Sequence, residues 1–512
     1  MFLTTLLMAV VALNVPEIVI HEKMPPYAEA DRVFKDVAVQ LDLSKAKAVS
    51  FDFTCGNLRP FRGFTLYFKC GSQWIQHGVN PEKPSGSVER FEFPIEEFGV
   101  GKLSDGNALT NVTAVRFAGA RYTAEETVAD AVVRNFEISE TPLPKKKFVA
   151  PIPVETIPAK DGERRLVWCH RAWGREREPG GAGWDEQIAE LKRAGFTDVL
   201  PNMAWAGRTY YRSEVYPADP VVDKYGDQLE LCKAACRKHG LRLHVWKCCW
   251  NMGSRKSVVA WDQEYRARMI REGRLQVDVS DGTGEPHLNW LCPNHPNNVR
   301  EETAAMVELA KKGVDGIHFD YIRYNAGGSC VCPRCRALFE ASLGRAVTNW
   351  PAAVSSDPAL KAAWKQFRCD TISSFVKGVV ERVRRECPKV EISAAVLASS
   401  GRAKYTVGQD WGRWAREGWL DFVCTMGYAP WYSLFRESRL GVVLQEKNPV
   451  TVYPGIGLGV WPRSDGRNGI RLREQVLAVR ELGFGGFNLF EWSLEAVRNL
   501  NVFGKLPECG NK

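Results

Sequence analysis

Two rhythms of hydrophobic and polar residues divide the chain. From about residue 17 to residue 140, apolar and polar residues alternate in short runs that turn residues separate. These runs read VAVQLDL, AVSFDFTC, FTLYFKC, RFEFPI, AVRFAG and AVVRNFEI. Alternation with period two is typical of strands that are buried on one face, and helical periodicity is almost absent. We therefore predict an antiparallel β-sandwich over residues 17–145.

A proline-rich stretch follows, which reads TPLPKKKFVAPIPVETIP over residues 141–158. Proline at this density prevents both a helix and a central strand. We expect a linker over residues 146–163, and we interpret the run of three lysines at its start as solvated.

After Arg164 the rhythm changes to a repeat of strand, loop and helix. The predicted strands read LVWCHRAW, TDVLPNMAW, LRLHVWKCCW, VDGIHFDYIRY, VEISAAVL, LDFVCTMGYA, VTVYPGIGLGV and GGFNLFEWS. Helical patterns lie between most of them, and several end in glycine, as a helix end favours. This alternation over residues 164–505 predicts an α/β fold, the (β/α)8 barrel. A doubly wound sheet is the rival, but no GxGxxG follows the first strand and no P-loop is present.

The fourth predicted strand carries the first candidate for catalysis. In barrels of this kind the site is built at the carboxyl ends of the strands. Gly316, His318 and Asp320 share one face of this strand, and Asp320 lies at its end. A carboxylate beside an inward-facing histidine is costly to bury unless it has a task. The alternative is a structural aspartate that accepts hydrogen bonds from loop amides.

Two further carboxylates fall near predicted strand ends. Glu491 ends the eighth strand, although it could equally cap the helix predicted after it. Asp410 lies in the loop after the fifth strand, whereas Asp421 begins the sixth strand at the opposite end and is expected to be structural. Paired carboxyl groups are typical of sites that hydrolyse glycosidic bonds: if this is such a site, one carboxyl protonates the leaving oxygen and the second attacks the anomeric carbon or activates water. We assign Asp320 as nucleophile or base, and Glu491 or Asp410 as the acid, its pKa raised by apolar neighbours.

Aromatic residues are abundant, with 17 Trp, 24 Phe and 14 Tyr. Flat rings stack on sugar faces, but large domains also bury them in their cores. Their collection at predicted strand ends favours stacking on a ligand. The predicted substrate-binding residues are His170, Trp173, Asn202, Trp205, Trp246, Lys247, His318, Arg323, Tyr324, Tyr428, Trp461 and Trp492.

The barrel resembles the glycosyl-hydrolase-like 10 family over about residues 165–500. The matching phrases are TYYRSEVYP, KHGLRLHVWKCCWN, CPNHPNNVREE, VDGIHFDYIRY and QDWGRWAREGWLDFVCTMGY. The resemblance implies a (β/α)8 barrel that acts on glycans, with Asp320 as the acid of strand four. The N-terminal runs resemble the jelly-roll modules, similar to carbohydrate-binding modules, that are found beside glycoside hydrolases.

The chitinase pattern DGxDxDxE is matched only in part. Asp315, Gly316 and Asp320 fit it, but His318 and Ile322 stand where the second Asp and the Glu would be. The chitinase mechanism therefore does not carry over. The fifth strand, SAAVLASS, also has no acid where several sugar-cleaving barrels place theirs.

The densest group of the 15 cysteines is the CxCxxC of Cys330, Cys332 and Cys335. Cys292 could supply a fourth thiolate from the same barrel face, with His295 as a spare ligand. Such a zinc would be structural, because four thiolates leave no open position. Disulfide pairing, which export would favour, and free thiols are the alternatives. We expect no cofactor for catalysis.

Residues 2–13 form a short apolar run that ends in small residues. It is too short to span a bilayer and resembles the core of a signal peptide, although the usual preceding Lys or Arg is missing. We expect a signal peptide over residues 1–16 and a secreted or periplasmic protein; a buried first strand is the alternative. The net charge of +9 comes from scattered basic residues, so nucleic-acid binding has little support, and no later segment predicts a membrane span.

The leading hypothesis is an exported glycoside hydrolase that acts on a poly- or oligosaccharide. The second is a glycan-binding barrel that keeps its aromatic cleft without a working acid pair. A third is another chemistry on the same fold, such as a polysaccharide deacetylase or lyase. The deacetylase would need a catalytic metal site, and no histidine-rich set at the strand ends provides one.

Overall fold

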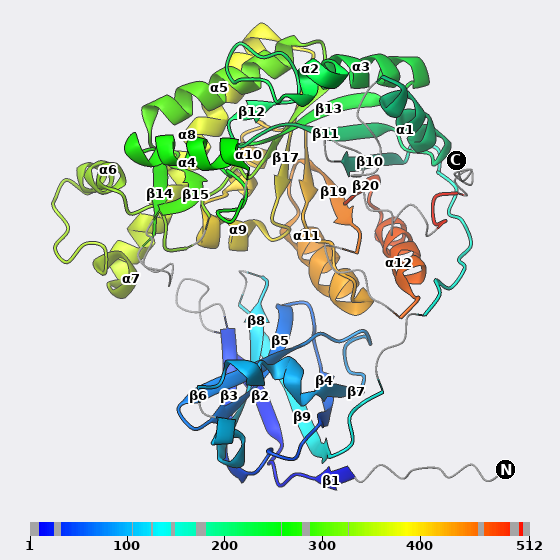
Figure 1. Cartoon of the computed structure of the whole chain (residues 1–512), viewed down its shortest axis with the longest axis vertical. Coiled ribbons are helices and arrows are strands. Elements are labelled where there is room, and N and C mark those ends of the chain that lie inside the picture. Colours follow the sequence, from blue (N-terminus) through cyan, green and yellow to red (C-terminus); the bar gives the residue numbers. More distant parts are fainter. Residues whose placement is uncertain are drawn as a thin grey trace. The chain divides into compact units, whose positions relative to one another are not determined.

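The computed structural model divides into two compact units (Figure 1). One unit takes residues 1–150, 429–445 and 463–466, and the other takes residues 151–428, 446–462 and 467–512. The structure describes residues 10–24, 32–104, 106–123, 126–144, 149–169, 181–257, 259–278, 287–325, 327–458, 465–491 and 501–504.

The first unit contains two antiparallel sheets, which confirms the predicted β-sandwich class. One sheet has the order β1 (Val10–Ala12), β9 (Val128–Ser139), β4 (Ala48–Cys55) and β7 (Glu89–Pro94), with β2 (Ile18–Lys23) also on β9. The other has the order β3 (Arg32–Leu41), β8 (Val112–Arg121), β5 (Phe61–Cys70) and β6 (Gln73–Val79). Short 3-10 turns η1 (Ile95–Phe98), η2 (Val100–Lys102) and η3 (Gly106–Thr110) connect β7 to β8. Inward residues of both sheets, among them Phe51, Phe53 and Phe64, form one buried core.

The first unit also contains a segment from far along the chain. The π-helix η4 (Leu434–Leu440) and most of α11 (Gly441–Glu446) belong to it, and Leu434 is part of the sandwich core. The Ser438 hydroxyl donates to the Phe61 carbonyl at 2.7 Å, and Glu437 accepts from the Ser85 amide at 3.0 Å. The predicted barrel range of 164–505 includes these residues. The pattern of hydrophobic and polar residues does not distinguish this segment from the barrel sequence around it, because the residues against which it packs are distant in sequence.

The second unit contains a closed barrel of eight parallel strands, as predicted. In chain order the strands are β10 (Arg164–Cys169), β11 (Asp198–Trp205), β13 (Arg242–Cys248), β16 (Gly316–Asp320), β17 (Glu391–Val396), β18 (Phe422–Thr425), β19 (Thr451–Ile456) and β20 (Gly486–Leu489). Each strand pairs with its neighbours in sequence order, and β10 pairs with both β11 and β20, which closes the ring. The short strand β12 (Arg208–Thr209) folds back on β11, and β14 (Leu275–Val277) and β15 (His287–Leu291) form a separate hairpin.

Helices surround the strands, as Figure 1 shows. They are α1 (Gly181–Arg193), α2 (Val221–Tyr225), α3 (Gln228–His239), α4 (Ala260–Arg271), α5 (Pro296–Lys311), α6 (Pro333–Leu343), α7 (Ala353–Ser356), α8 (Pro358–Glu386), α9 (Ser400–Val407), α10 (Trp411–Arg416) and α12 (Asn468–Glu481). Local sequence sets several of their ends. Asp227 accepts from the first amides of α3, and Gly240 ends that helix in the left-handed conformation.

An ion cluster lies at the amino ends of the barrel strands. The Arg164 guanidinium of β10 binds Asp198 of β11 at 2.6 Å and Glu391 of β17 at 2.9 Å. The His244 imidazole of β13 lies 3.0 Å from the same Asp198 carboxylate. Burial opposes ionisation of Asp198, but hydrogen bonds from His244 and Arg164 more than offset it and lower its pKa. The first, second, third and fifth strands are thereby joined across the barrel floor.

The predicted signal peptide reaches into the described residues only at its end. Val10–Ala12 form β1, which pairs with β9, and residues 1–9 lie outside the described residues. Within the part of the chain that the structure describes, no helix has both the length and the apolarity to cross a bilayer.

We expect Arg164→Ala to lower the free energy of unfolding of the barrel by about 3–5 kcal/mol, because it removes two hydrogen bonds to the buried Asp198 carboxylate. Urea denaturation, followed by the barrel's own unfolding transition, measures the change. Arg242→Ala is the control, since this side chain pairs with the same Glu391 but is 42% exposed, so that its loss should cost about 1 kcal/mol or less. Equal losses would contradict a stabilising role of the buried cluster.

Candidate active site

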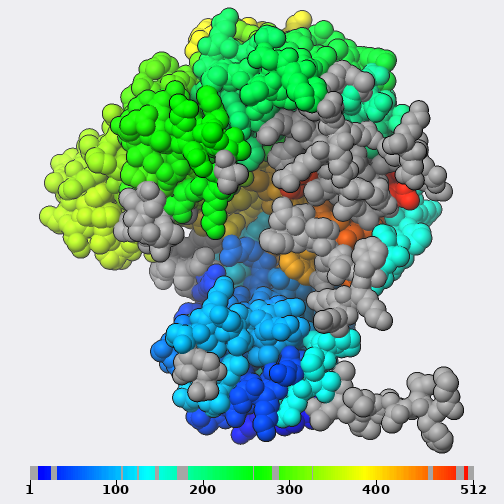
Figure 2. Space-filling model, in the orientation of Figure 1, coloured from blue at the N-terminus to red at the C-terminus, as the bar shows by residue number. Residues whose placement is uncertain are grey.

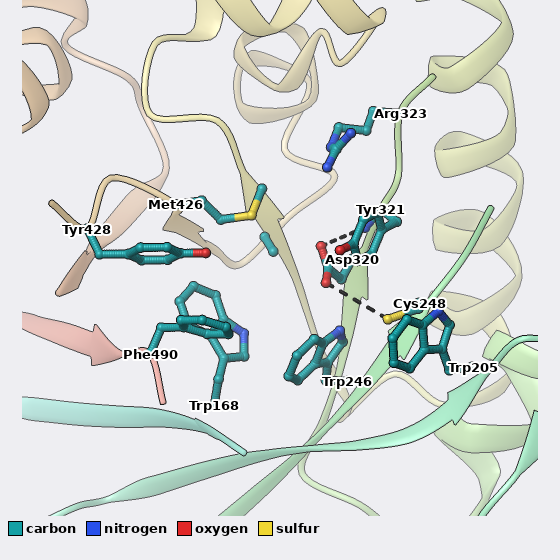
Figure 3. A pocket seen from close by; sticks show the side chains of 11 residues that line it. Trp168, Trp205, Trp246, Cys248, Asp320, Tyr321, Arg323, Met426, Tyr428 and Phe490 are labelled. Carbon is teal, nitrogen blue, oxygen red and sulfur yellow. Dashed lines mark hydrogen bonds between the residues drawn. The ribbon is translucent and has the colours of Figure 1, made fainter. Parts of the chain in front are cut away.

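A cavity of about 340 Å³ opens at the carboxyl ends of the barrel strands (Figure 3). Six aromatic rings line it, together with a carboxylate, a guanidinium and three small or apolar side chains. The lining residues are Trp168, Trp205, Trp246, Cys248, Asp320, Tyr321, Arg323, Ala395, Met426, Tyr428 and Phe490. Several of them also belong to the hydrophobic cluster that fills the barrel interior, so the floor of the pocket is the top layer of the barrel core.

Asp320 is the last residue of β16, and its carboxylate faces this cavity (Figure 3). One carboxylate oxygen accepts from the Tyr321 amide at 2.6 Å, and the Cys248 thiol lies 4.0 Å from the other. Burial raises the pKa of Asp320 to about 6, against smaller opposing effects of the Tyr321 amide, Arg323 and the Trp246 indole. Asp320 is therefore protonated in a substantial fraction of molecules near pH 6.

The opposite wall of the pocket is aromatic. Tyr428 and Phe490 stack with ring centres 4.8 Å apart, and Trp168 meets Phe490 edge-on at 6.0 Å. The Trp168 indole N–H donates to Nε2 of His318 at 3.1 Å, and Nδ1 of His318 is 2.8 Å from the Ser393 hydroxyl. Burial lowers the pKa of His318 to about 3, so the ring is neutral and carries its proton on Nδ1. His318 thus orients Trp168 from below.

Arg323 is the cationic group among the described lining residues. Its guanidinium lies over the Tyr321 ring at 5.0 Å and over the Trp290 ring at 5.2 Å. Its Nε is buried without a hydrogen-bond acceptor among the described residues, and burial lowers the pKa of the group. The planar fork of donors is therefore held by ring contacts and can bind an oxygen of a ligand.

Glu491 directly follows the lining residue Phe490 and is buried. Burial raises the pKa of the Tyr428 phenol, and the charges of Asp320 and Glu491 both add to the increase. Tyr428 therefore lies close enough to both carboxylates for their negative charges to disfavour ionisation of its phenol. Glu491 itself is not among the residues that line the cavity.

Asp410, predicted as a candidate acid, is not among the residues that line the cavity. It is the N-cap of α10, its carboxylate accepts from the Arg413 amide at 3.4 Å, and Lys404 lies 3.3 Å away. Asp421 accepts from the Ile392 amide at 2.7 Å, in keeping with the structural task expected for it. The Asp410 carboxylate thus caps a helix, and the Asp421 carboxylate accepts a backbone hydrogen bond at the start of a strand.

Lys247 and Tyr324 also lie outside the pocket, although both were predicted to bind substrate. Lys247 is buried in an ion pair with Glu302 of α5, because alternate residues of β13 point out toward the helices. Tyr324 is fully buried beneath the Arg368 guanidinium, 4.6 Å from its ring centre. The cause in both cases is side-chain direction, which position at a strand end does not reveal.

Asn202 takes an indirect place, since its amide donates to the Cys248 sulfur at 3.1 Å behind the pocket wall. Trp205, Trp246, Arg323 and Tyr428 line the pocket, and His318 lies beneath it. The remaining predicted residues, His170, Trp173, Trp461 and Trp492, lie outside the described residues.

Several lining residues were not predicted, although the alternation of the strands marks four of them. Trp168 lies two positions before His170, and Phe490 two positions before Trp492, so each shares the strand face of a residue that was chosen. Cys248 and Met426 likewise lie two positions from the predicted Trp246 and Tyr428, whereas Ala395 carried no such signal, because small and apolar residues are the ordinary content of a barrel interior.

The four predicted metal ligands come together away from the pocket. The sulfur atoms of Cys292, Cys330, Cys332 and Cys335 all lie within 4.8 Å of one another, and all four residues are buried. His295 is the N-cap residue of α5 and is not part of this group.

The chain shares its fold with the glycoside hydrolase domain of PgaB (BpsB) from Bordetella bronchiseptica, with a TM-score of 0.51. The two are 16% identical, and the match covers 67% of this chain and 99% of that domain. The catalytic domain of β-amylase from Paenibacillus polymyxa matches with a TM-score of 0.45 and 13% identity, over 64% of this chain and 92% of that one. A comparison with curated proteins finds no match.

A family comparison confirms the resemblance seen in the motifs. The Glycosyl hydrolase-like 10 family matches residues 181–451, which include five of the eight barrel strands in full and the first residue of a sixth. This range is more than half of the chain, and it contains Asp320 and most of the residues that line the pocket. The chain therefore belongs to the glycosyl hydrolase-like 10 family.

Proposed function

We propose that the protein hydrolyses O-glycosidic bonds of a poly- or oligosaccharide in this pocket, with Asp320 as the proton donor. The observation that carries the proposal is a single buried carboxyl group, with a pKa of about 6, at the end of a barrel strand and opposite a wall of aromatic rings. A proton donor must hold its proton at working pH and release it to a leaving oxygen, and a raised pKa suits both steps.

This assignment exchanges the roles expected from the sequence. The sequence predicts Asp320 as nucleophile or base and Glu491 or Asp410 as the acid. Burial of Asp320 raises its pKa and so favours the protonated form, which a proton donor needs and a nucleophile does not. The thiol of Cys248 adds no charge, because burial and the nearby Asp320 raise its own pKa.

Glu491 is the best candidate for the second carboxylate. It follows the pocket residue Phe490, and its charge reaches Tyr428, which also feels Asp320. In the proposed reaction Glu491 attacks the anomeric carbon or activates a water, while Asp320 protonates the departing oxygen. Asp410 is not used, since capping α10 accounts for its carboxylate.

The aromatic rings and Arg323 bind the substrate in this proposal. Tyr428 and Phe490 present flat apolar surface to a sugar ring, and the Arg323 fork donates to sugar oxygens beside Asp320. In this proposal side chains of the protein carry out hydrolysis without a cofactor. A zinc ion at the four cysteines would be structural. Export, supported by the apolar N-terminal run, and sugar binding by the sandwich belong to the same proposal.

One observation favours a second function, glycan binding without hydrolysis. Among the described residues that line the pocket, Asp320 is the single carboxylate. A barrel that lacks a working acid pair would still hold a sugar between its rings. The experiments on Asp320 and Glu491 separate the two functions.

We expect Asp320→Asn to lower kcat/KM on unactivated oligosaccharides about 100- to 10,000-fold, because the leaving oxygen loses its proton donor. Release of reducing sugar from a glycan panel measures the loss. With 2,4-dinitrophenyl glycosides, whose leaving group needs no proton, the variant should keep most of its activity. In the wild type, kcat/KM should fall as pH rises above about 6, since the acid then loses its proton.

Asp410→Asn is the matched control and should keep the wild-type rate and pH profile. Folding of Asp320→Asn is checked by urea denaturation at pH 8, where removal of a buried charge should raise the free energy of unfolding by up to about 3 kcal/mol. Equal hydrolysis by Asp320→Asn and the wild type would refute the assignment. Sugar binding by both proteins, without hydrolysis by either, would establish the binding function instead.

We expect Glu491→Ala to abolish hydrolysis and azide to restore turnover, with a glycosyl azide as product, because the small anion replaces the missing carboxylate. Chromatography of the product and its anomeric configuration report whether the lost group was a nucleophile or a base. Glu481→Ala, at the exposed end of α12, is the control. Full activity of Glu491→Ala would place the second carboxylate elsewhere.

We expect Arg323→Met to raise KM about 10- to 100-fold, because the substrate loses charge-assisted hydrogen bonds. The descending limb of kcat/KM should also move to higher pH, since the Arg323 charge lowers the pKa of Asp320. Steady-state kinetics over a pH series measures both effects, with Arg382→Met on the surface of α8 as the control. Unchanged KM would exclude Arg323 from substrate binding.

A further inference from the structure

Four buried cysteines from two separate segments meet at one point beside the barrel. Cys292 directly follows β15, Cys330 and Cys332 lie in the segment after β16, and Cys335 is in the first turn of α6. Cys292 has its sulfur 3.8 Å from that of Cys330, 3.9 Å from that of Cys332 and 3.5 Å from that of Cys335.

These separations match the edges of a tetrahedron around a metal ion. Zn–S bonds of about 2.3 Å in tetrahedral geometry place the sulfur atoms about 3.8 Å apart. A disulfide would bring two sulfur atoms to about 2.05 Å and separate that pair from the others. Instead, Cys292 is at nearly the same distance from three partners, and all four cysteines are free. This arrangement favours a shared central ion over either alternative that the sequence left open.

Nearby N–H groups are directed at the sulfur atoms, as a thiolate site requires. The Val277 amide of β14 donates to the Cys330 sulfur at 3.3 Å, and the Asn294 side-chain amide donates to the Cys335 sulfur at 3.3 Å. Donors of this kind stabilise the negative charge of metal-bound thiolates. They come from outside the CxCxxC segment, so the surroundings are built for the cluster as a whole.

The cluster joins two parts of the barrel unit that are separate in sequence. It links the β14–β15 hairpin to the segment after β16, where one backbone bond, from the Val331 amide to the Val277 carbonyl at 2.9 Å, also connects them. The following helices α6 and α7 lie at the outer surface of the unit, in yellow-green in Figure 2. The cysteine cluster therefore connects the β14–β15 hairpin to the start of the segment that contains α6 and α7.

The hairpin in turn supports one wall of the pocket. Trp290 of β15 meets the Tyr321 ring edge-on at 5.3 Å and lies under the Arg323 guanidinium at 5.2 Å. Both Tyr321 and Arg323 line the cavity beside Asp320, whereas Trp290 stands behind them. A shift of the hairpin would therefore change the position of both pocket residues.

We propose that Cys292, Cys330, Cys332 and Cys335 bind one zinc ion in a closed site, and that this ion holds Trp290 against Tyr321 and Arg323. The ion is structural, because four thiolates leave no position for a substrate or water. The metal site itself is independent of the proposed hydrolase function. The second part concerns the position of the pocket wall, and the importance of that position for catalysis rests on the proposed function.

Metal analysis of the full-length protein tests the first part. Protein purified without added metal should contain about one zinc ion per chain, which an organomercurial thiol reagent should release. Cobalt exchanged into the site should show the visible absorption of a tetrahedral cobalt thiolate. Cys332→Ser should lose most of the zinc, whereas Cys236→Ser should keep it, since Cys232 and Cys236 pair at 4.0 Å outside any such group of described ligands.

The proposal is overturned by protein that lacks zinc when purified with zinc present, by iron in its place, or by disulfides among these cysteines in an unreduced digest. If Cys332→Ser does not fold, release of zinc from the wild-type protein by the thiol reagent still tests the proposal.

Hydrogen exchange tests the second part without any substrate. Removal of zinc from the folded wild type should speed amide exchange in peptides that cover residues 287–291 and 321–325. Peptides of β5 in the sandwich serve as the internal control and should not change. Faster exchange in the hairpin alone would leave the zinc site in place but refute its role at the pocket. Because neither readout uses hydrolysis, failure here is distinct from failure of the proposed function.

Discussion

Closure of the barrel is the constraint on which the site depends. β10 is hydrogen-bonded to β11 on one side and to β20 on the other, so the first and last strands become neighbours. Only in a closed ring do the carboxyl ends of β16 and β20 face one cavity, with Asp320 on one side and Phe490 on the other. The ion cluster of Arg164 holds the opposite end of the same ring.

Closure also sets the chemistry of Asp320. The ring is filled with apolar side chains up to the level of Trp168 and Trp246, so a carboxyl group on the top layer is poorly hydrated. Burial raises the pKa of Asp320, whereas Asp198 at the other end has its pKa lowered by Arg164 and His244. Two buried aspartates of one barrel thus differ because one has a full set of partners, and the incompletely paired one is suited to proton transfer.

Segments outside the strand–helix repeat complete the two units. Residues 429–445 leave the barrel sequence and add Leu434 to the sandwich core. The β14–β15 hairpin leaves it as well, and it supports the pocket through Trp290. Each of these two segments makes contacts with residues distant in sequence whose periodicity it does not share. In the case of the hairpin, four cysteine thiols lie where it meets the segment after β16.

The sequence by itself determined the architecture and the place of the candidate acid. Period-two alternation, glycine at helix ends and eight apolar runs predicted the sandwich and the barrel, and the end of the fourth run identified Asp320, because these signals are local. Tertiary structure decided which strand-end residues face the pocket: Lys247 turns to Glu302, and Asp410 caps a helix. It also brought Cys292 to the CxCxxC segment and raised the pKa of Asp320. The direction of Lys247 follows from the alternation along β13, but its partner Glu302, the burial of Asp320 and the place of Cys292 depend on residues distant in sequence, so the order of residues alone could not supply them.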